Sequence, residues 1–345
     1  MKKTKEVTIY DIAKKLNIAA STVSRGLQDS PEIGKKTKKK IFEVAAKMGY
    51  QVNHYARSLR QQQTNTIGVV VHVLNSNFVN SVLAGIEKVT AEAGYDILIA
   101  HSSESYVKEV ANAKNLFYRR VDGLIVSLSS ETMDTDHFKP FVEKGIPVLF
   151  FDRVEQDENN TVVIIDNAKC GYNATKHLID QGCKRIAHVT ASLKRNVYAE
   201  RYKGYLKAIE DHGIPFNEEL LMVGNLTEKG ALEAAQKILL MKPMPDGIFF
   251  SNDFSAAVCM RILKENGITV PDDIAIVGFN NDPIGKLIEP TLTTINYPGE
   301  DMGEIAARSL INHLNGLSNI NQTNVITIRS DLIVRKSSLK KTRIN

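Results

Sequence analysis

The sequence lacks the features of secreted, membrane-bound and disulfide-stabilised proteins. Its three cysteines are odd in number and lack metal-ligand spacing, so we expect buried thiols in a reducing compartment at Cys170, Cys183 and Cys259. No apolar run approaches the length of a membrane span, and the N-terminus MKKTKEVTIYD lacks the apolar core of a signal peptide. These absences predict a cytoplasmic protein with no membrane partner.

The motifs of common enzyme classes are missing too. No GxGxxG follows the first expected strand and no GxxxxGK[ST] occurs, so nothing indicates a dinucleotide or nucleotide enzyme. No GxSxG elbow is present, and the eight histidines are scattered without metal-ligand spacing. We therefore expect no enzymatic activity, no cofactor and no metal. Tryptophan is absent as well, so any stacking on a ligand falls to Phe or Tyr.

Positive charge is concentrated at one end of the chain. Residues 1–60 hold 14 Lys and Arg against 5 Asp and Glu, whereas the remainder of the 345 residues holds 30 against 34. A run such as KKTKKK at 35–40 is usually a solvated face, but such a run next to a helix-turn-helix would add attraction to phosphates. Length and charge together predict a small nucleic-acid-binding domain ahead of a larger, two-lobed part.

Residues 7–28, VTIYDIAKKLNIAASTVSRGLQ, have the pattern of two short helices with a tight break. Thr8 and Asp11 have capping-box spacing, apolar residues follow at helical intervals, and Asn17 suits a left-handed helix end. Four polar residues share one face of the second helix: Ser21, Thr22, Ser24 and Arg25. Such hydroxyls bond phosphates, and a guanidinium can read guanine. The spacing predicts a helix-turn-helix, although a solvated helical hairpin without a ligand has the same pattern.

A third helix should follow the turn-rich connection at 29–34. Its apolar residues begin at Ile41, and Gly49 is a suitable C-terminal cap. Residues 53–61 also have a helical pattern, but they contain too few apolar residues to fold alone. The simpler interpretation of this segment is a flexible linker, which we accept for 61–65.

Strands alternate with helices from Thr66 onward, which predicts a parallel sheet covered by helices. The alternation then repeats, because residues 245–253 parallel 121–129 and residues 266–281 parallel the strand segment that ends at Asp152. The sequence therefore predicts two doubly wound lobes in tandem. Ligands of such sheets bind beyond the carboxyl ends of the strands, so two facing lobes would enclose a cleft.

The segment 7–28 resembles the LacI/GalR family of bacterial transcription regulators, whose opening pattern is VTxxDVAxxAGVSxxTVSRVLN. The similarity continues through IxKxTKxKIxEVAxxMGYxxNxxARSL at 33–59 and EPTLTTINYPGEDMGEIAARSLINHLNG at 289–316. The resemblance implies a small all-α helix-turn-helix DNA-binding domain followed by two α/β doubly wound parallel-sheet lobes of the periplasmic-binding-protein-like type. It also implies a homodimer on a palindromic operator in double-stranded DNA.

These expectations divide the chain into four parts. They are a helix-turn-helix domain at 1–52, a hinge helix and linker at 53–65, a two-lobed effector-binding and dimerisation domain at 66–335, and a basic tail at 336–345. The resemblance implies three crossings between the lobes, near 161–164, 290–294 and 321–324. The first lobe would then comprise about 66–162 plus 293–322, and the second about 163–291 plus 323–335.

The resemblance further suggests which residues contact DNA. We expect base reading by Ala20, Ser21 and Arg25, and further contacts, mostly to the backbone, by Thr8, Tyr10, Thr22, Ser24, Tyr50 and Asn53. Leu59 would wedge into the minor groove from a hinge that becomes helical on DNA. Three positions depart from the family pattern: Ala19, Gly26 and Val52. The first two should each cost the recognition helix about 1 kcal/mol.

Five residues form the candidate effector site: Phe78, Asp152, Arg201, Asn252 and Asn280. Arg201 matches the effector arginine of the family and suits bidentate recognition, and Phe78 could stack on a ring. Asp152 and Asn252 could equally be helix-cap or turn residues. Asn280 stands where the family most often has Asp, and Asn accepts one hydrogen bond and donates one. This departure argues against the usual plain-sugar ligand. The effector class that the resemblance implies is a sugar or a sugar derivative.

The sequence thus predicts a transcriptional regulator, in the pattern of a repressor, whose sugar-like effector changes its affinity for DNA. The tail lacks the leucine heptad of the lactose repressor tetramer, so a dimer is expected. Two alternatives remain open. The chain could be a cytoplasmic ligand-binding protein with weak DNA affinity, or its effector could be a phosphocarrier protein.

Overall fold

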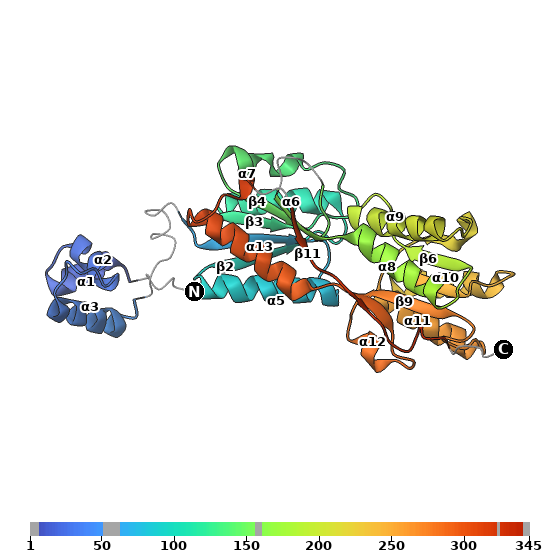
Figure 1. Ribbon diagram of the computed structural model, residues 1–345. Coiled ribbons are helices and arrows are strands. Elements are labelled where there is room, and N and C mark those ends of the chain that lie inside the picture. The colour runs from blue at the N-terminus through green and yellow to red at the C-terminus, as the bar shows by residue number, and fades with distance from the viewer. Residues whose placement is uncertain (1–6, 51–62, 156–160, 323–324, 341–345) are drawn as a thin grey trace. The chain divides into compact units, whose positions relative to one another are not determined.

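The structure is a computed structural model that describes residues 7–50, 63–155, 161–322 and 325–340. The chain divides into two units, residues 1–64 and 65–345 (Figure 1). The predicted Asn53 and Leu59 contacts fall on residues outside the described ranges.

Within residues 7–50, the first unit forms three helices. They are α1 (Ile9–Leu16), α2 (Ala20–Leu27) and α3 (Lys35–Met48). The capping box of Thr8 and Asp11 is present, and Asn17 and Gly49 adopt the left-handed conformation with φ of 54° and 68°. The predicted helix-turn-helix pattern is therefore confirmed, including its start and stop signals. Its core is small: Ile12, Ala13, Val23, Ile41 and Ala45.

Gly26 has a packing role that the sequence did not indicate. It is buried, and a β-carbon at this position would overlap Cδ1 of Ile41 on α3. We expected this glycine only to weaken α2, but its missing side chain also lets α2 and α3 approach each other. Ala19 provides no side-chain cap for α2, as expected.

The second unit contains two six-stranded sheets, which define two lobes. The first sheet has the order β11-β5-β4-β3-β1-β2, with β1 (Thr66–Val71), β2 (Asp96–His101), β3 (Gly123–Val126), β4 (Val148–Phe151), β5 (Thr161–Ile165) and β11 (Val325–Ile328). The second has the order β12-β10-β9-β8-β6-β7, with β6 (Ile186–Thr190), β7 (Leu221–Val223), β8 (Gly247–Phe250), β9 (Ala275–Asn280), β10 (Thr293–Asn296) and β12 (Leu332–Ile333). All neighbours are parallel except β10 and β12. The predicted fold class is confirmed.

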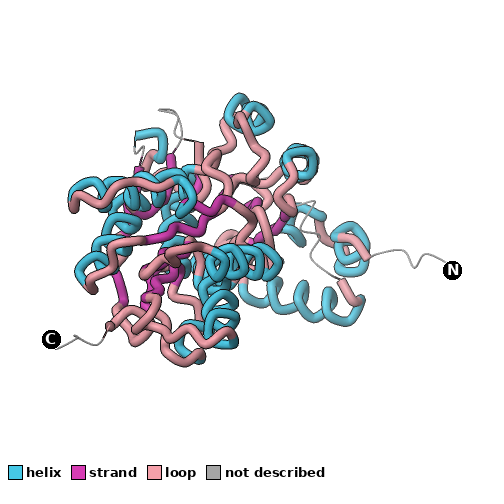
Figure 2. The backbone as a smooth tube through the Cα atoms, turned by 90° about the vertical axis from the view of Figure 1, so that its right-hand side faces the viewer, coloured by secondary structure: helices cyan, strands magenta, loops and turns pink. Residues whose placement is uncertain are grey.

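Helices cover these sheets, and in Figure 2 they flank the strands. The first lobe has α5 (Asn77–Glu92), α6 (Tyr106–Tyr118), η1 (Asp136–Phe138), α7 (Lys139–Glu143), α13 (Gly299–Leu314) and η3 (Ile320–Gln322). The second has α8 (Asn167–Asp180), α9 (Asn196–Asp211), η2 (Glu218–Leu220), α10 (Glu228–Leu240), α11 (Asp253–Glu265) and α12 (Ile284–Leu287).

The three chain crossings lie later than expected, at residues 165–167, 296–299 and 328–332. Strand β10 therefore belongs to the second sheet rather than to the first lobe, and β11 belongs to the first sheet rather than to the second lobe. The two strands at the end of the chain do not pair with each other, because β11 pairs with β5 and β12 pairs with β10. The physical reason is that β10 and β11 each pair in parallel with the last strand before them in their own sheet, β9 and β5. The chain crosses to the other lobe only after this pairing.

Each lobe has one helix pair that meets at two glycines. In the first lobe, Gly85 of α5 faces Gly303 of α13, and a β-carbon on either would lie 2.9 Å from a backbone nitrogen of the opposite helix. In the second lobe, Gly171 of α8 and Gly204 of α9 meet in the same way. Close backbone approach at equivalent places agrees with the sequence repeat.

The three cysteines are buried free thiols, as predicted. Burial raises the pKa of Cys183 to about 11 and that of Cys259 to about 12. Among the described helices, none combines the length and apolar character needed to cross a bilayer.

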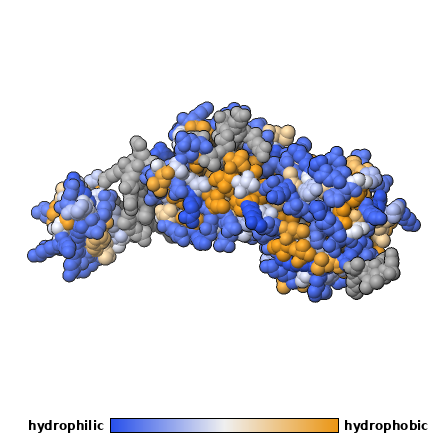
Figure 3. Space-filling model, viewed as in Figure 1, coloured by the Kyte–Doolittle hydropathy of each residue, from blue (hydrophilic) through white to orange (hydrophobic). Residues whose placement is uncertain are grey.

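Large apolar side chains remain exposed on both lobes. Leu287 of α12 is 83% exposed, Val325 of β11 is 49% exposed and Ile99 of β2 is 46% exposed. Figure 3 shows apolar residues gathered into a patch on each lobe in the face that is in view. Patches of this kind mark surfaces suited to association.

Candidate functional site

The candidate DNA-contacting residues of the first unit fall into two groups. Exposed to solvent are Thr8, Tyr10, Ser21 and Arg25. Half-buried are Ala20, Thr22, Ser24 and Tyr50, of which Ala20 and Tyr50 pack on the helical core. The exposed group includes Ser21 and Arg25, which are two of the three expected base readers.

Arg25 has an acidic neighbour that sequence reasoning missed. Its Nη1 donates to Oε2 of Glu32 at 2.8 Å, and the two side chains are 56% and 66% exposed. A pair this exposed contributes at most about 1 kcal/mol, so a nucleic acid base can displace Glu32. The pairing holds the guanidinium at the surface of the helix-turn-helix.

Three of the five candidate effector residues converge on Tyr297, which lies in the second crossing between the lobes. Its ring stacks on Phe78 with a centroid distance of 4.1 Å, and its hydroxyl donates to Oδ1 of Asp152 at 2.5 Å. The guanidinium carbon of Arg201 lies 5.4 Å from the Tyr297 centroid and 3.5 Å from that of Phe279. We define the Tyr297 cluster as Phe78, Asp152, Arg201, Phe279 and Tyr297. It joins both lobes, and all five side chains are buried.

Arg201 is held by neutral acceptors on its own lobe. Its Nε donates to Oδ1 of Asn167 at 2.8 Å, and its Nη1 donates to the Ser251 carbonyl at 3.0 Å. Its own backbone carbonyl lies against Gly171 at the α8–α9 contact. The helix crossing therefore sets the position of this arginine.

Asp152 and Asn280 occupy equivalent positions in the two lobes. They stand at the carboxyl ends of β4 and β9 with φ of 58° and 111°. Backbone strain of this kind gathers at functional sites. Burial raises the pKa of the Asp152 carboxyl, while Arg153, the Tyr297 hydroxyl and Arg201 oppose that rise.

Asn252 and Asn280 make their contacts within the second lobe. Asn252 is the N-cap of α11, because its Oδ1 accepts from Ser255 N at 2.9 Å while its Nδ2 donates to the Leu226 carbonyl. The helix-cap interpretation that was left open for Asn252 therefore describes its place in this structure. Asn280 is half-buried and hydrogen-bonds the side chain of Asp282.

The start of α9 bridges to the first lobe beside the Tyr297 cluster. Asn196 donates to the Asp152 carbonyl at 3.0 Å and accepts from Val154 N at 3.1 Å. The Nη2 of Arg153 donates to the Tyr198 hydroxyl at 3.1 Å. Because these groups bridge the lobes and the cluster is buried, a ligand reaches the cluster only if the lobes part.

Comparison with known proteins matches both units. A model described as bacterial regulatory proteins of the lacI family matches residues 8–53, and one described as a periplasmic binding protein-like domain matches residues 175–338. Catabolite control protein A of Priestia megaterium is 30% identical over 310 residues, which cover 90% of this chain and 93% of that protein.

The chain belongs to the LacI family of bacterial regulatory proteins.

Solved structures of transcription regulators have the same fold. A complex of the transcriptional regulator CelR with cellobiose is 26% identical and has a TM-score of 0.72, covering 96% of this chain and all of that one. The lac repressor dimer bound to operator and an anti-inducer has a TM-score of 0.86 at 23% identity, covering 97% and 100%, which supports the fold alone. The relatives are transcriptional regulators of metabolic genes, and so this LacI-family chain is a regulator rather than an enzyme.

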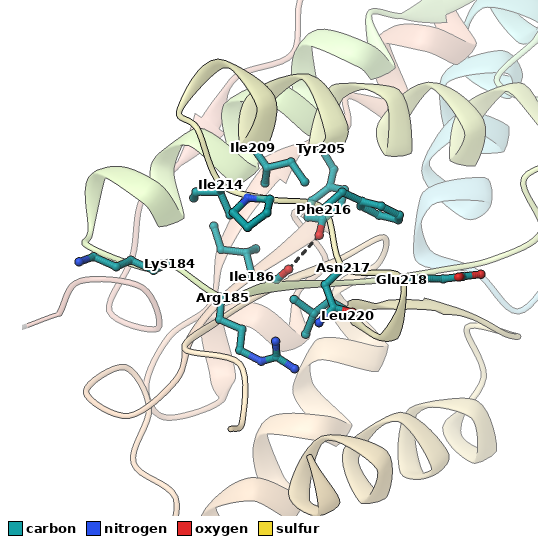
Figure 4. A pocket seen from close by; sticks show the side chains of 11 residues that line it. Lys184, Arg185, Ile186, Tyr205, Ile209, Ile214, Phe216, Asn217, Glu218 and Leu220 are labelled. Carbon is teal, nitrogen blue, oxygen red and sulfur yellow. Dashed lines mark hydrogen bonds between the residues drawn. The ribbon is translucent and has the colours of Figure 1, made fainter. Parts of the chain in front are cut away.

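A separate pocket of about 600 Å³ lies in the second lobe of this LacI-family chain (Figure 4). Its lining includes Lys184, Arg185, Tyr205 and Phe216, and the Tyr205 hydroxyl donates to the Ile186 carbonyl at 2.9 Å. None of the five candidate effector residues lines this pocket. It is therefore distinct from the Tyr297 cluster.

Tyr297 was missed by sequence reasoning although a signal was present. It directly follows β10, and polar or aromatic residues at that edge of a sheet are the ones that meet ligands. The position of Tyr297 between the lobes was missed because the second crossing was expected before β10, whereas the chain crosses after β10.

Asp253, beside Asn252, has a buried carboxyl group whose pKa is raised. Its Oδ1 accepts from Thr294 Oγ1 and its Oδ2 from Asp282 N, both at 2.7 Å. Burial outweighs these bonds and raises the pKa of Asp253 to about 8. The folded protein therefore holds this proton more tightly than the unfolded chain does.

Because the ordinary pKa of this carboxyl is 3.8, we expect the contribution of Asp253 to the free energy of unfolding to fall as pH rises from about 4 to about 8. Asp253→Asn keeps a side chain that can bond both partners without titrating, so its stability should change less over this range. Urea unfolding at several pH values measures the difference, with Asp301→Asn at an exposed site as the control. The same pH dependence in wild type and Asp253→Asn would contradict the raised pKa.

Proposed function

We propose that this chain is a sequence-specific transcriptional repressor that binds a palindromic operator in double-stranded DNA as a homodimer and acts in the cytoplasm. A sugar or sugar derivative between the lobes is the proposed effector. Residues 1–52 would bind DNA, residues 53–65 would form the hinge, and residues 66–335 would bind the effector and dimerise.

The observation that carries the proposal is the exposed reading face of α2 on a chain whose two lobes meet at the buried Tyr297 cluster. Ser21 and Arg25 on that face can reach a major groove. The cluster takes residues from both lobes. If the lobes can be either closed together or parted, a ligand at the cluster would bind these two arrangements with different affinity. A ligand with such differential affinity shifts the population of the two arrangements, and that shift can bias DNA binding.

Two further facts support parts of the proposal. The CelR structure holds cellobiose, which favours a sugar-type effector for a chain with the same fold. The exposed apolar side chains of Ile99 and Leu287 are suited to burial against a second copy. The first fact supports a sugar-type effector, and the second supports assembly into a dimer.

The first test is operator selection from random duplex DNA with the purified full chain at near-physiological salt. The proposal expects a recovered palindrome with a flexible central step, bound by two chains as measured by mass photometry. The alternative of a ligand-binding protein with weak DNA affinity expects salt-sensitive retention without a preferred sequence. Recovery of a half-site bound by one chain would contradict the dimer.

A further inference from the structure

The pocket of the second lobe lies at the opposite end of its sheet from the candidate effector residues. Ile186 is the first residue of β6, and Arg185 directly precedes it, so the pocket is at the amino end of this strand. Asn252 and Asn280 stand at or just beyond the carboxyl ends of β8 and β9, which run parallel to β6. The pocket is therefore a site in its own right and not an extension of the effector site.

The inner surface of the pocket is mainly apolar and includes an exposed aromatic ring. Ile186, Ile209 and Leu220 line it and are buried, whereas Phe216 is 48% exposed although it lines the same space (Figure 4). A volume of about 600 Å³ is within the usual range for small organic ligands. An exposed ring beside buried aliphatic side chains is suited to stacking on the ring of such a ligand.

Arg185 supplies a positioned guanidinium at the edge of the pocket. Its Nε donates to the Pro243 carbonyl at 3.0 Å, which holds the side chain in place. Its Nη2 lies 3.9 Å from Oε2 of Glu219, which is longer than a hydrogen bond, and the Glu219 side chain is 75% exposed. An ion pair at this distance and exposure is weak, so a carboxylate of a ligand can replace Glu219.

The charges of the lining favour an anion with a single negative charge. Lys184 and Arg185 line the pocket together with one acid, Glu218, so the lining carries one excess positive charge. Figure 4 shows the Glu218 side chain extending away from the apolar side chains. A carboxylate with one negative charge matches this balance, whereas a phosphate carries up to two negative charges.

The pocket also contacts the helix that carries the candidate effector arginine. Tyr205 and Ile209 of α9 line it, and Tyr205 follows Arg201 by about one turn. The Tyr205 hydroxyl donates to the Ile186 carbonyl at 2.9 Å, and its ring stacks on that of His188 at a centroid distance of 5.3 Å. A ligand in the pocket would therefore touch the same helix that positions Arg201.

We propose that this pocket is a second ligand site and that its ligand is a planar aromatic carboxylate. The ring would stack on Phe216, and the carboxylate would accept hydrogen bonds from the Nη groups of Arg185. Because the ligand would contact α9, its binding would provide a second input to the arrangement of the lobes. The ligand site is independent of the function proposed above, and only its influence on DNA binding rests on that function.

The first test measures binding of three probes to the full chain by isothermal titration. Indole-3-acetate has both the ring and the carboxylate, indole-3-ethanol has only the ring, and acetate has only the carboxylate. We expect indole-3-acetate to bind at least about tenfold more tightly than either of the other two, because a hydrogen bond to a charged group adds to the stacking. Equal affinity for indole-3-acetate and indole-3-ethanol, or no binding of indole-3-acetate at about millimolar concentration, would overturn the proposal.

Two variants then locate the bound probe. Arg185→Gln should bind indole-3-acetate no more tightly than indole-3-ethanol, because it removes the charge that distinguishes them. Phe216→Ala should weaken the binding of both indoles by at least about fivefold, because it removes the stacking surface. Thermal unfolding of each variant checks that the fold is kept, which we expect because Phe216 is exposed and Arg185 lies at the pocket edge.

Matched controls come from the same lobe. Arg261→Gln removes an exposed guanidinium, and Leu240→Ala removes an exposed apolar side chain, and neither residue lines the pocket. Both controls should bind indole-3-acetate as the wild type does. If Arg185→Gln and Phe216→Ala also bind it as the wild type does, the probe occupies another site and the proposal is wrong.

Operator binding tests the influence of the pocket on DNA. Saturating indole-3-acetate should change the operator affinity of the wild type by at least about threefold and leave that of Phe216→Ala unchanged. An unchanged affinity in the wild type would contradict the second input through α9. The titrations involve no DNA, so a chain that binds the probe but no operator would count against the repressor alone. A chain that binds operator but not the probe would count against the second ligand site alone.

Discussion

Replacing Gly204 by valine is expected to lower the free energy of unfolding by at least about 3 kcal/mol. A β-carbon on Gly204 would lie 2.5 Å from the backbone nitrogen of Tyr172 and closer still to the carbonyl oxygen of Ala168. Both atoms belong to the backbone of α8, so no side-chain rotation can relieve the overlap. The two helices would have to separate along their crossing.

This substitution should also impair the candidate effector site. Arg201 precedes Gly204 by one turn, and its bonds to Asn167 and Ser251 depend on the same helix contact. Urea unfolding followed by circular dichroism measures the loss of stability. Gly224→Ala is the matched control, because a β-carbon at Gly224 meets nothing within 4 Å. If the unfolding midpoint of Gly204→Val equals that of wild type, α8 and α9 do not pack backbone to backbone.

Arg25→Ala is expected to weaken binding to the selected operator by about 1–3 kcal/mol and to relax the preference at one base pair. The guanidinium is exposed on α2 and can reach a guanine edge, where it bonds O6 and N7 together. Alanine makes no such bonds, so the correct base loses its advantage over the others. Competition binding with operators that carry each base at each position measures both effects.

The partner of Arg25 provides the matched variant. Glu32→Gln keeps the shape of the side chain but removes its negative charge, so Arg25 no longer has to leave a carboxylate to reach DNA. We expect binding to operator and random DNA to strengthen together, by up to about fivefold. If Arg25→Ala weakens operator and random DNA equally, Arg25 contacts only phosphate.

Local signals explain how much of the fold could be predicted. Asn17 and Gly49 end helices because they tolerate a left-handed backbone, and that property belongs to each residue alone. The strands of both lobes were recognisable because a buried parallel strand is a continuous apolar run. The repeat then required that Asp152 and Asn280 occupy equivalent ends of two sheets.

The rest depends on contacts between distant parts of the chain. Tyr297 lies in the second crossing and meets Phe78 and Asp152 of the first lobe from more than 140 residues away in sequence, and no local pattern encodes that meeting. The displaced crossings arose because a strand pattern shows that a strand exists and does not show which sheet it joins.

The two outermost strands β11 and β12 have a consequence for how the protein is made. They lie within residues 325–333, and each forms the edge of a different sheet. A ribosome must therefore translate past residue 328 before the first sheet has all of its strands, and past residue 333 before the second sheet has all of its strands. Helices α1, α2 and α3 emerge much earlier and contain their own core. During synthesis, the part proposed to read DNA can fold while the part proposed to control it is still incomplete.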